Sequence, residues 1–278
     1  MKVYLLMSQH ADDEQFELLN QVFSQEPLRQ DTGVNMQEDK QQDTLYSSSV
    51  IEVRADPGRE QRKGVPEVIF GETKETAQII TMARSLLAGS GRAIISRVRP
   101  EVIEALRAEL PEYTLRTRAA ARAVVIYEHG HVRRKTGGRV GIISAGTSDV
   151  PVAEEAALIA EEMGCDVTCI YDVGVAGLHR LIEPLRKLLA SGVDAIVVAA
   201  GMDGALPSVV AGLASVPVIG LPTSTGYGMG GKGVAALLSM LQTCAPGLVV
   251  VNIDNGVGAG STAALIANRV AQARGARL

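Results

Sequence analysis

"DAIVVAAGMDGALPSVVAGLASVPVIGLP", residues 194–222, contains two apolar runs separated by a glycine-rich loop and a helical segment. The runs 194–200 and 216–221 are continuously apolar, which is typical of strands buried on both faces of a parallel sheet. The segment 204–215 between them has the apolar spacing of a helix. The stretch therefore predicts two parallel strands joined by a crossover helix.

The same unit is repeated along residues 139–278. Further apolar runs lie at 139–145, 166–171 and 247–253, and further helical segments lie at 152–164, 176–192, 233–243 and 261–275. This alternation predicts an α/β fold with about five parallel strands and helices on both faces of the sheet.

A smaller α/β unit is predicted upstream. Its expected strands are 65–70, 93–98 and 122–127, and its expected helices are 74–89 and 100–110. The segment "YEHGHVRRKTGG" is predicted to be an exposed connector with like charges at Arg133, Arg134 and Lys135, and with a hairpin tip at His129 and His131. We therefore divide the chain into a small domain (51–130), a connector (131–138) and a larger domain (139–278).

Residues 1–50 carry a weaker signal. Leu18, Leu19, Val22 and Phe23 are spaced as one face of a helix, whereas "NMQEDKQQDT" (35–44) is polar and expected to be mobile.

Composition argues against several classes of function. The chain has 278 residues, a formal net charge of −4, no Trp and three Phe, so neither a basic patch nor a stacking platform for nucleic acid is expected. Cys165, Cys169 and Cys244 follow no disulfide or zinc pattern, and the four histidines lack metal-ligand spacing. With no apolar leader or membrane span, a cytoplasmic protein is expected.

Ligands of open parallel sheets bind beyond the carboxyl ends of the strands. The loops predicted there are rich in glycine, which lets backbone amides approach a ligand, and they precede helix N-termini, which favour phosphate. A nucleotide-sized ligand is therefore predicted, with ordinary turn chemistry as the alternative for each loop taken alone. The candidate residues in these loops are Ser148, Asp149, His179, Arg180, Gly201, Asp203, Tyr227, Lys232, Asp254 and Asn255.

Several candidates have a structural interpretation as well. Ser148 or Asp149 is suited to cap a helix, and His179 and Arg180 to lie on a solvated helix face. Asp203 stands in a very apolar stretch, where it is either a cap or a carboxylate whose pKa burial raises into the range useful for proton transfer. We favour proton transfer.

Cys244 follows a predicted helix and precedes a predicted strand. Free cysteines are usually buried and inert, and the carboxyl end of a helix disfavours a thiolate. A reactive Cys244 therefore requires a nearby cation, supplied by Lys232, by Arg180 or by a positively charged substrate.

Taken together, these loops resemble those of PurE, the family of aminoimidazole ribonucleotide carboxylases and mutases. The closer resemblance is to the LarB family, over about residues 56–270. It is carried by "REQRKGVPEVIFGETK" (59–74), "ISAGTSDVPVAEEA" (143–156), "GVAGLHR" (174–180), "AAGMDGALPSVV" (199–210), "PTSTGYG" (222–228) and "SMLQTCAPGLVVVNIDNGVGAG" (239–260). The last block separates LarB from PurE.

The resemblance implies a PurE-like, flavodoxin-like domain and a pyridinium-3,5-biscarboxylic acid mononucleotide synthase of nickel-pincer cofactor biosynthesis. Such an enzyme carboxylates nicotinic acid adenine dinucleotide at C5 with CO2 or bicarbonate and hydrolyses its phosphoanhydride, releasing AMP. No tightly bound cofactor is implied, although the phosphoanhydride makes Mg2+ a candidate assistant. A homo-oligomer, with an octamer as one candidate, is also implied.

The resemblance assigns roles residue by residue. Cys244 is the nucleophile and Asp203 the base, although the family usually has glutamate at position 203, so the shorter side chain favours a bridging water. Ser148, Asp149, His179 and Arg180 match loops that hold ribose, phosphate or CO2. Arg59, Glu67 and Lys74 receive no role beyond adenylate contacts or packing against another subunit.

Two other functions stay open at this point. One is a PurE-like enzyme acting on aminoimidazole ribonucleotide, although "GVAGLHR" lacks the Ser-Ala-His-Arg loop typical of PurE. The other is a non-catalytic nucleotide-binding module.

Overall fold

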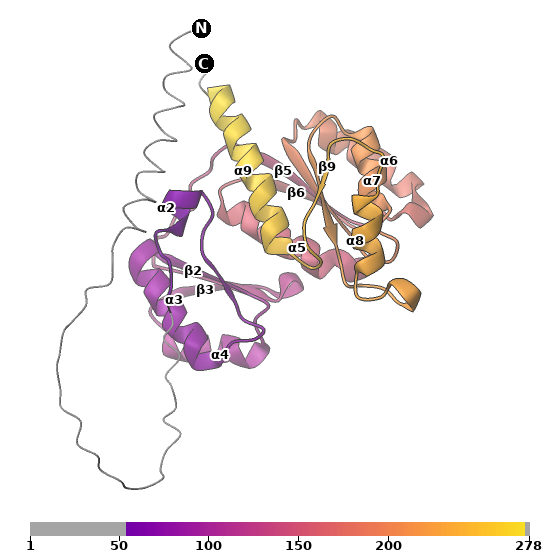
Figure 1. The fold of residues 1–278 in the computed structure, drawn as a ribbon. Helices are drawn as coiled ribbons and strands as arrows, with labels where there is room; N and C mark the ends of the chain where they lie inside the picture. The colour runs from indigo at the N-terminus through magenta and orange to yellow at the C-terminus, as the bar shows by residue number, and fades with distance from the viewer. Residues whose placement is uncertain (1–53, 276–278) are drawn as a thin grey trace, which may run out of the picture. The chain divides into compact units, whose positions relative to one another are not determined.

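The computed structural model describes residues 54–275, which contain two β-sheets within one compact unit (Figure 1). The expectations for residues 1–50, including the helix face and the mobile polar segment, lie outside these residues.

The first sheet is mixed and has the strand order β1-β2-β4-β3. β1 (Val68–Phe70) is parallel to β2 (Arg92–Ser96), and β4 (Ala123–Tyr127) pairs antiparallel with β2 and with β3 (Thr114–Arg118). Its helical elements are α2 (Arg59–Lys63), α3 (Thr76–Ser90), α4 (Pro100–Glu109) and the 3₁₀ turn η1 (Ala119–Ala121). The sequence missed β3, because its residues "TLRTR" are mostly polar and half-exposed at the sheet edge.

This sheet is buried on both faces. Ile95 and Val124 belong to a core shared with α3 and α4, whereas Ile94 and Val125 belong to a core shared with helix α5 (Val150–Glu162) of the following domain. Neighbouring residues along a strand point to opposite faces, so β2 and β4 reach both cores. The small domain therefore packs its second face against the larger domain.

The second sheet is entirely parallel and has the order β6-β5-β7-β8-β9. Its strands are β5 (Arg139–Ser144), β6 (Asp166–Ile170), β7 (Ala195–Ala200), β8 (Val218–Pro222) and β9 (Leu248–Val250). Its helices are α5 (Val150–Glu162), α6 (His179–Ala190), α7 (Leu206–Leu213), α8 (Val234–Leu241) and α9 (Gly256–Gly275), with 3₁₀ turns η2 (Thr147–Asp149), η3 (Val175–Gly177) and η4 (Gly228–Gly230).

The helices cover both faces of this sheet (Figure 1). Side chains of α5 and α9 share one core with Ile142 and Val197, and side chains of α6, α7 and α8 share another with Ile143 and Ile196. The predicted three-layer flavodoxin-like fold is confirmed. The strand order reverses beside β5, so the ligand crevice is expected beyond the carboxyl ends of β5 and β7.

Two details of the sequence interpretation are wrong. The edge strands β6 and β9 are not buried on both faces: their residues are exposed or half-buried, whereas every residue of the central strand β7 is buried. The turn at Gly130 (φ 80°) exists, but it leads from β4 to β5 in different sheets and is therefore no hairpin tip.

Close packing of α5 against α9 leads to a first prediction. A Cβ on Gly260 would lie 2.3 Å from the Ala156 carbonyl oxygen. Because this contact is with backbone, Gly260→Ala is expected to lower the free energy of unfolding by about 1–3 kcal/mol. Gly212→Ala in α7 is the matched control, since its Cβ would meet no atom within 4 Å, and a gain of up to ~1 kcal/mol is expected there. Urea midpoints measure both, and equal midpoints for the two variants would contradict the close packing.

Candidate active site

Asp149 is the centre of the ligand loops. It lies directly after β5, in η2, and is only 4% exposed. Its carboxylate accepts hydrogen bonds from the Gly146 N–H (2.9 Å) and from the buried Thr223 hydroxyl (2.6 Å). Asp149 is thus positioned at the start of α5, as predicted, but its carboxylate joins the loop after β5 to the loop after β8.

The loops after β7 and β9 join the same arrangement. The Met202 N–H donates to the Thr225 carbonyl (2.8 Å), and the Thr225 hydroxyl donates to the Ser148 carbonyl (3.3 Å). The Ser224 N–H donates to the Asp254 carboxylate (2.8 Å). Four loops of the carboxyl edge therefore form one connected surface.

Gly201 contributes to this surface by its lack of a side chain. A Cβ there would lie 2.2 Å from the Thr225 carbonyl oxygen and 2.7 Å from the Thr223 hydroxyl. Because Gly201 is buried, it lets the loops after β7 and β8 pack together.

A cavity of about 370 Å³ opens onto these loops. On the side of the larger domain it is lined by Ser148, Ser224, Thr225 and Asp254. Of these, Ser148 and Asp254 are predicted site residues. The small domain supplies the opposite wall, through Glu72, Arg97, Ala121 and Arg122. Its volume lies within the range of ligand pockets.

Arg97 connects the small domain to the ligand loops through its side chain. Its guanidinium donates to the Asp254 carbonyl oxygen and lies 3.5 Å from the Glu155 carboxylate, which also accepts from the Ser96 hydroxyl. Arg97 has a φ of 51°, an uncommon conformation for a residue other than glycine. Such strain at a cavity wall is typical of functional positions.

The sequence did not identify Arg97, Arg122 or Glu155 as site residues. The one local signal is "SRVRP" (96–100), where two arginines stand between a buried strand and the proline that begins α4. The two arginines that line this cavity, Arg97 and Arg122, are suited to hold a carboxylate or phosphate.

Four other predicted residues have peripheral positions. Arg180 is exposed at the start of α6 and pairs with Asp172 (2.8 Å), and the neighbouring His179 is exposed. Tyr227 and Lys232 are exposed in the loop after β8. All four follow carboxyl ends of strands, although none lines the 370 Å³ cavity. Asn255 has a local role, because its side-chain oxygen accepts from the Gly258 N–H (2.8 Å) at the start of α9.

The expected burial of Asp203 is wrong. Met202 (φ 53°) and Gly204 (φ 61°) turn the chain outward between β7 and α7, so the carboxylate is exposed. Its oxygen accepts from the Ala205 N–H (3.4 Å), immediately before α7. This contact beside the start of α7 agrees with the alternative prediction that Asp203 acts as a helix cap. The exposed carboxylate is also accessible to a ligand or a water.

Cys244 is exposed, so its interpretation as a small buried hydrophobe is wrong. It lies in the connection that leads from the end of α8 to the start of β9, at the amino edge of the sheet. Asp203 follows β7 at the carboxyl edge. Arg180 and Lys232, the two cations proposed to activate Cys244, belong to carboxyl-edge segments as well, and these residues do not meet Cys244 within one chain.

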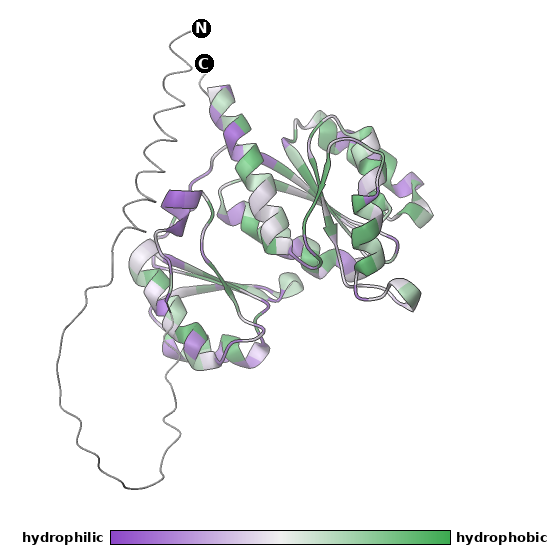
Figure 2. Ribbon diagram, in the orientation of Figure 1, coloured by the Kyte–Doolittle hydropathy of each residue, from purple (hydrophilic) through white to green (hydrophobic). Residues whose placement is uncertain are grey.

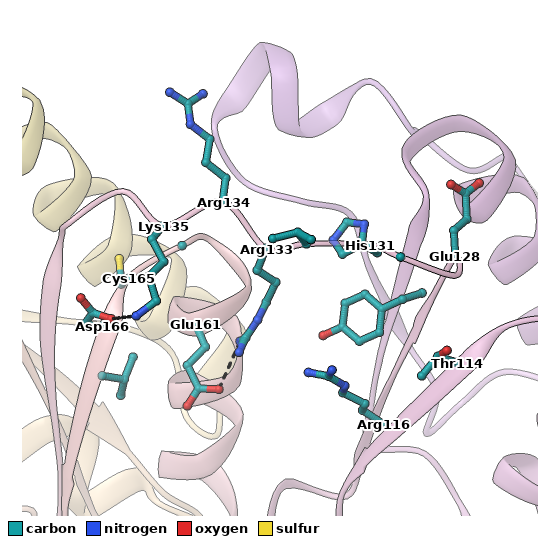
Figure 3. Close-up of a pocket in the computed structure, with 15 residues that line it drawn as sticks. Thr114, Arg116, Glu128, His131, Arg133, Arg134, Lys135, Glu161, Cys165 and Asp166 are labelled. Carbon is teal, nitrogen blue, oxygen red and sulfur yellow. Dashed lines mark hydrogen bonds and ion pairs between the residues drawn. The ribbon is translucent and has the colours of Figure 1, made fainter.

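A second cavity, of about 610 Å³, lies beside the connector (Figure 3). Arg133 lies 3.6 Å from Glu161 and 3.4 Å from Glu162, and Lys135 lies 2.9 Å from Asp166. The connector is exposed, as predicted, and carboxylates of the larger domain pair with two of its three like charges. The cavity adjoins the amino end of β6 and includes none of the carboxyl-edge loop residues, so it is separate from the ligand loops.

Cysteine reactivity follows from burial. Burial raises the pKa of the Cys165 thiol to about 11 and also raises the pKa of Cys169, whereas Cys244 is exposed. At pH 8 only about one thousandth of Cys165 is thiolate, because a raised pKa favours the protonated form. Iodoacetamide is therefore expected to label Cys244 first in the native protein and Cys165 after unfolding. Peptide mass mapping over time measures this order, and equal labelling rates would contradict it.

Among the residues that the structure describes, no three His, Cys, Asp or Glu side chains gather as a metal site. In the same part of the chain, no helix has the length and apolarity needed to cross a bilayer.

Comparison with known proteins fits this architecture. Residues 139–278 match the AIR carboxylase family, and residues 48–128 match the LarB/PurE-like N-terminal domain. The chain is 43% identical to the uncharacterized protein MJ0165 of Methanocaldococcus jannaschii over 227 residues, which is 80% of this chain and 86% of that protein. It is also 36% identical to the N5-carboxyaminoimidazole ribonucleotide mutase of Thermotoga maritima over 135 residues, 46% of this chain and 74% of that enzyme. The corresponding mutase of Pyrococcus abyssi is 35% identical, with 46% and 71% coverage.

The parallel sheet, its carboxyl-edge loops and these relatives define a PurE-like domain of the carboxylase or mutase type. The N-terminal domain at residues 48–128 identifies the family more closely. The chain belongs to the LarB family, with a PurE-like C-terminal domain.

Proposed function

We propose that the protein carboxylates the pyridinium ring of nicotinic acid adenine dinucleotide at C5 and hydrolyses the phosphoanhydride. The products are pyridinium-3,5-biscarboxylic acid mononucleotide and AMP, for nickel-pincer cofactor biosynthesis. The observation that carries this proposal is the exposed Cys244 within the block that distinguishes LarB from PurE. The LarB-type domain at 48–128 supports it.

The chemistry explains why a thiolate is needed. A pyridinium carbon is electrophilic and does not attack CO2. Addition of the Cys244 thiolate at C4 neutralises the ring and makes C5 an enamine-like nucleophile. C5 then forms a bond to CO2, a base removes the C5 proton, and the electron pair of that C–H bond restores the aromatic ring as the C4–S bond breaks. The positive charge of the substrate ring favours the thiolate, which answers the objection from the helix terminus.

The carboxyl-edge residues have complementary roles in this proposal. Asp203 accepts the C5 proton, directly or through one water, since its exposed carboxylate is accessible. Arg97 and Arg122 hold carboxylate or phosphate oxygens of the dinucleotide in the 370 Å³ cavity.

The test supplies the wild-type protein with nicotinic acid adenine dinucleotide and bicarbonate. AMP and a mononucleotide heavier by one carboxyl group are expected, and ¹³C-bicarbonate should label that group. A wild-type protein that forms neither product would end the proposal.

A second candidate function rests on the mutase relatives. Turnover of N5-carboxyaminoimidazole ribonucleotide, measured in parallel, would favour it. Saturable nucleotide binding without turnover of either substrate would favour a non-catalytic binding module.

A further inference from the structure

Three polar side chains of β3 lie on the face of the first sheet that is turned toward α5. Thr114, Arg116 and Arg118 alternate along the strand, whereas Leu115 packs against the core that contains α3 and α4. Arg118 is engaged, because two carboxylates of α5 accept hydrogen bonds from its guanidinium. These two carboxylates therefore compensate the charge of Arg118 and not that of Arg116.

Within residues 54–275, no carboxylate pairs with Arg116. Its guanidinium instead packs on the ring of Tyr127, 5.5 Å from the ring centroid. This ring is held in turn, since its hydroxyl donates to the buried Glu162 carboxylate (2.6 Å). An arginine that is already positioned in this way loses less side-chain entropy when its N–H groups bind a ligand.

Arg116 and two residues of the connector line the 610 Å³ cavity together. Figure 3 shows Arg116 from β3 and Arg133 from the connector approaching the same space, with His131 two residues earlier along the connector. The His131 ring lies 5.1 Å from the Tyr127 ring. Figure 2 shows the connector as hydrophilic, in contrast to the hydrophobic central strands of the parallel sheet. The cavity is therefore lined by nitrogen donors from two segments of the chain.

The carboxylates of the cavity do not compensate all of its positive charge. Glu161 is shared between Arg118 (2.8 Å) and Arg133 (3.6 Å). Glu128 also lines the cavity, but its carboxylate is directed away from Arg116 (Figure 3). Arg116 thus keeps an uncompensated charge at the cavity wall, where an anionic group would pair with it.

We propose that this cavity is a second ligand site, which binds the phosphate group of a small phosphorylated molecule. Arg116 and Arg133 approach from different elements, so their donors reach a ligand from more than one direction. A tetrahedral phosphate has oxygens in several directions, whereas the two oxygens of a carboxylate share one plane with its carbon. The volume of about 610 Å³ also accommodates an organic part beside the phosphate.

The second ligand site is separate from the carboxyl-edge loops. Asp149 stands directly before α5 and Glu161 lies in its last turn, and the 13 residues of the helix span about 20 Å. A small ligand beside Glu161 therefore does not reach Asp149. The inference consequently goes beyond the proposed function and does not depend on it.

Titration calorimetry at low ionic strength tests the site with inorganic pyrophosphate as the probe. Arg116→Ala is expected to raise the Kd of the wild-type site at least about 10-fold, because it removes hydrogen bonds to a charged group. Thr114→Glu should have a similar effect, since it places a carboxylate on the same face of β3, two residues from Arg116. Arg269→Ala removes an exposed arginine of α9 that lines neither cavity, and it should leave the Kd unchanged.

Two further titrations separate this site from other anion sites. Arg97→Ala alters the cavity beside the ligand loops, so pyrophosphate binding that depends on Arg116 should persist in that variant. Malonate, a dicarboxylate, should bind the wild-type protein more weakly than pyrophosphate. The inference would be overturned if the wild-type protein bound no pyrophosphate at millimolar concentration, if Arg97→Ala alone abolished binding, or if neither Arg116→Ala nor Thr114→Glu changed the Kd. Malonate binding as tight as that of pyrophosphate would refute the assignment to phosphate.

Discussion

Cys244→Ala is expected to lower the rate of carboxylation by at least about 10³-fold, equivalent to roughly 4 kcal/mol of transition-state stabilisation. Without the thiolate, C5 of the pyridinium ring is no nucleophile, and no other cysteine can substitute, since Cys165 is buried and Cys169 lies half-buried in β6. Cys244→Ser should be similarly inactive, because an alcohol forms its anion far less readily than a thiol. The measurement is the initial rate of carboxylated product under saturating bicarbonate.

Cys169→Ala is the matched control, because it removes a thiol from the same domain away from the loop before β9. It should keep most of the activity. In addition, wild-type protein given the dinucleotide without bicarbonate should gain the mass of one substrate under native mass spectrometry. After mild unfolding, the wild-type protein should retain this mass covalently. The covalent adduct should be absent from Cys244→Ala. A Cys244→Ala variant that retained more than about a tenth of the rate would remove Cys244 from the nucleophile role.

The fold of the larger domain was predictable because its signal is local. Each central strand is a continuous apolar run, and each crossover helix is bounded by glycine or proline. The edge strand β3 was missed for the opposite reason, since its polar residues are stabilised by pairing with β4 and not by burial of an apolar face. Local patterns thus identify buried strands better than exposed ones.

The candidate site was predictable only in part. The position of Asp149 follows from the rule that ligands bind beyond parallel strands, and its hydrogen bond to Thr223 confirms that two predicted loops meet there. The exposure of Asp203 depends on two left-handed residues that apolar composition does not indicate. The placement of Arg97 depends on contact between two domains, with 157 residues separating it from its hydrogen-bond partner Asp254. No local pattern specifies such a contact.

Arg97→Ala is expected to raise the KM for the dinucleotide by roughly 10- to 100-fold, because a hydrogen bond to a charged group contributes about 1.5–3 kcal/mol. The Arg97 side chain is 23% exposed and lines the cavity, while its guanidinium also donates to the Asp254 carbonyl oxygen. The kcat should change much less, since Arg97 holds an anionic group of the substrate and does not touch the reacting carbons. Steady-state kinetics separates the two constants.

Matched variants distinguish a role of Arg97 in substrate binding from a role in connecting the two domains. Arg97→Lys keeps the charge but loses the forked donor, so an intermediate KM is expected. Arg107→Ala removes an exposed guanidinium that pairs locally with Glu104 (3.1 Å) on α4, and it should leave KM and the urea midpoint nearly unchanged. If Arg97→Ala lowered the midpoint but left KM within twofold of the wild type, Arg97 would connect the two domains without holding the substrate. A raised KM with an unchanged midpoint would instead identify the small domain as the part of the chain that recognises the anionic end of the dinucleotide.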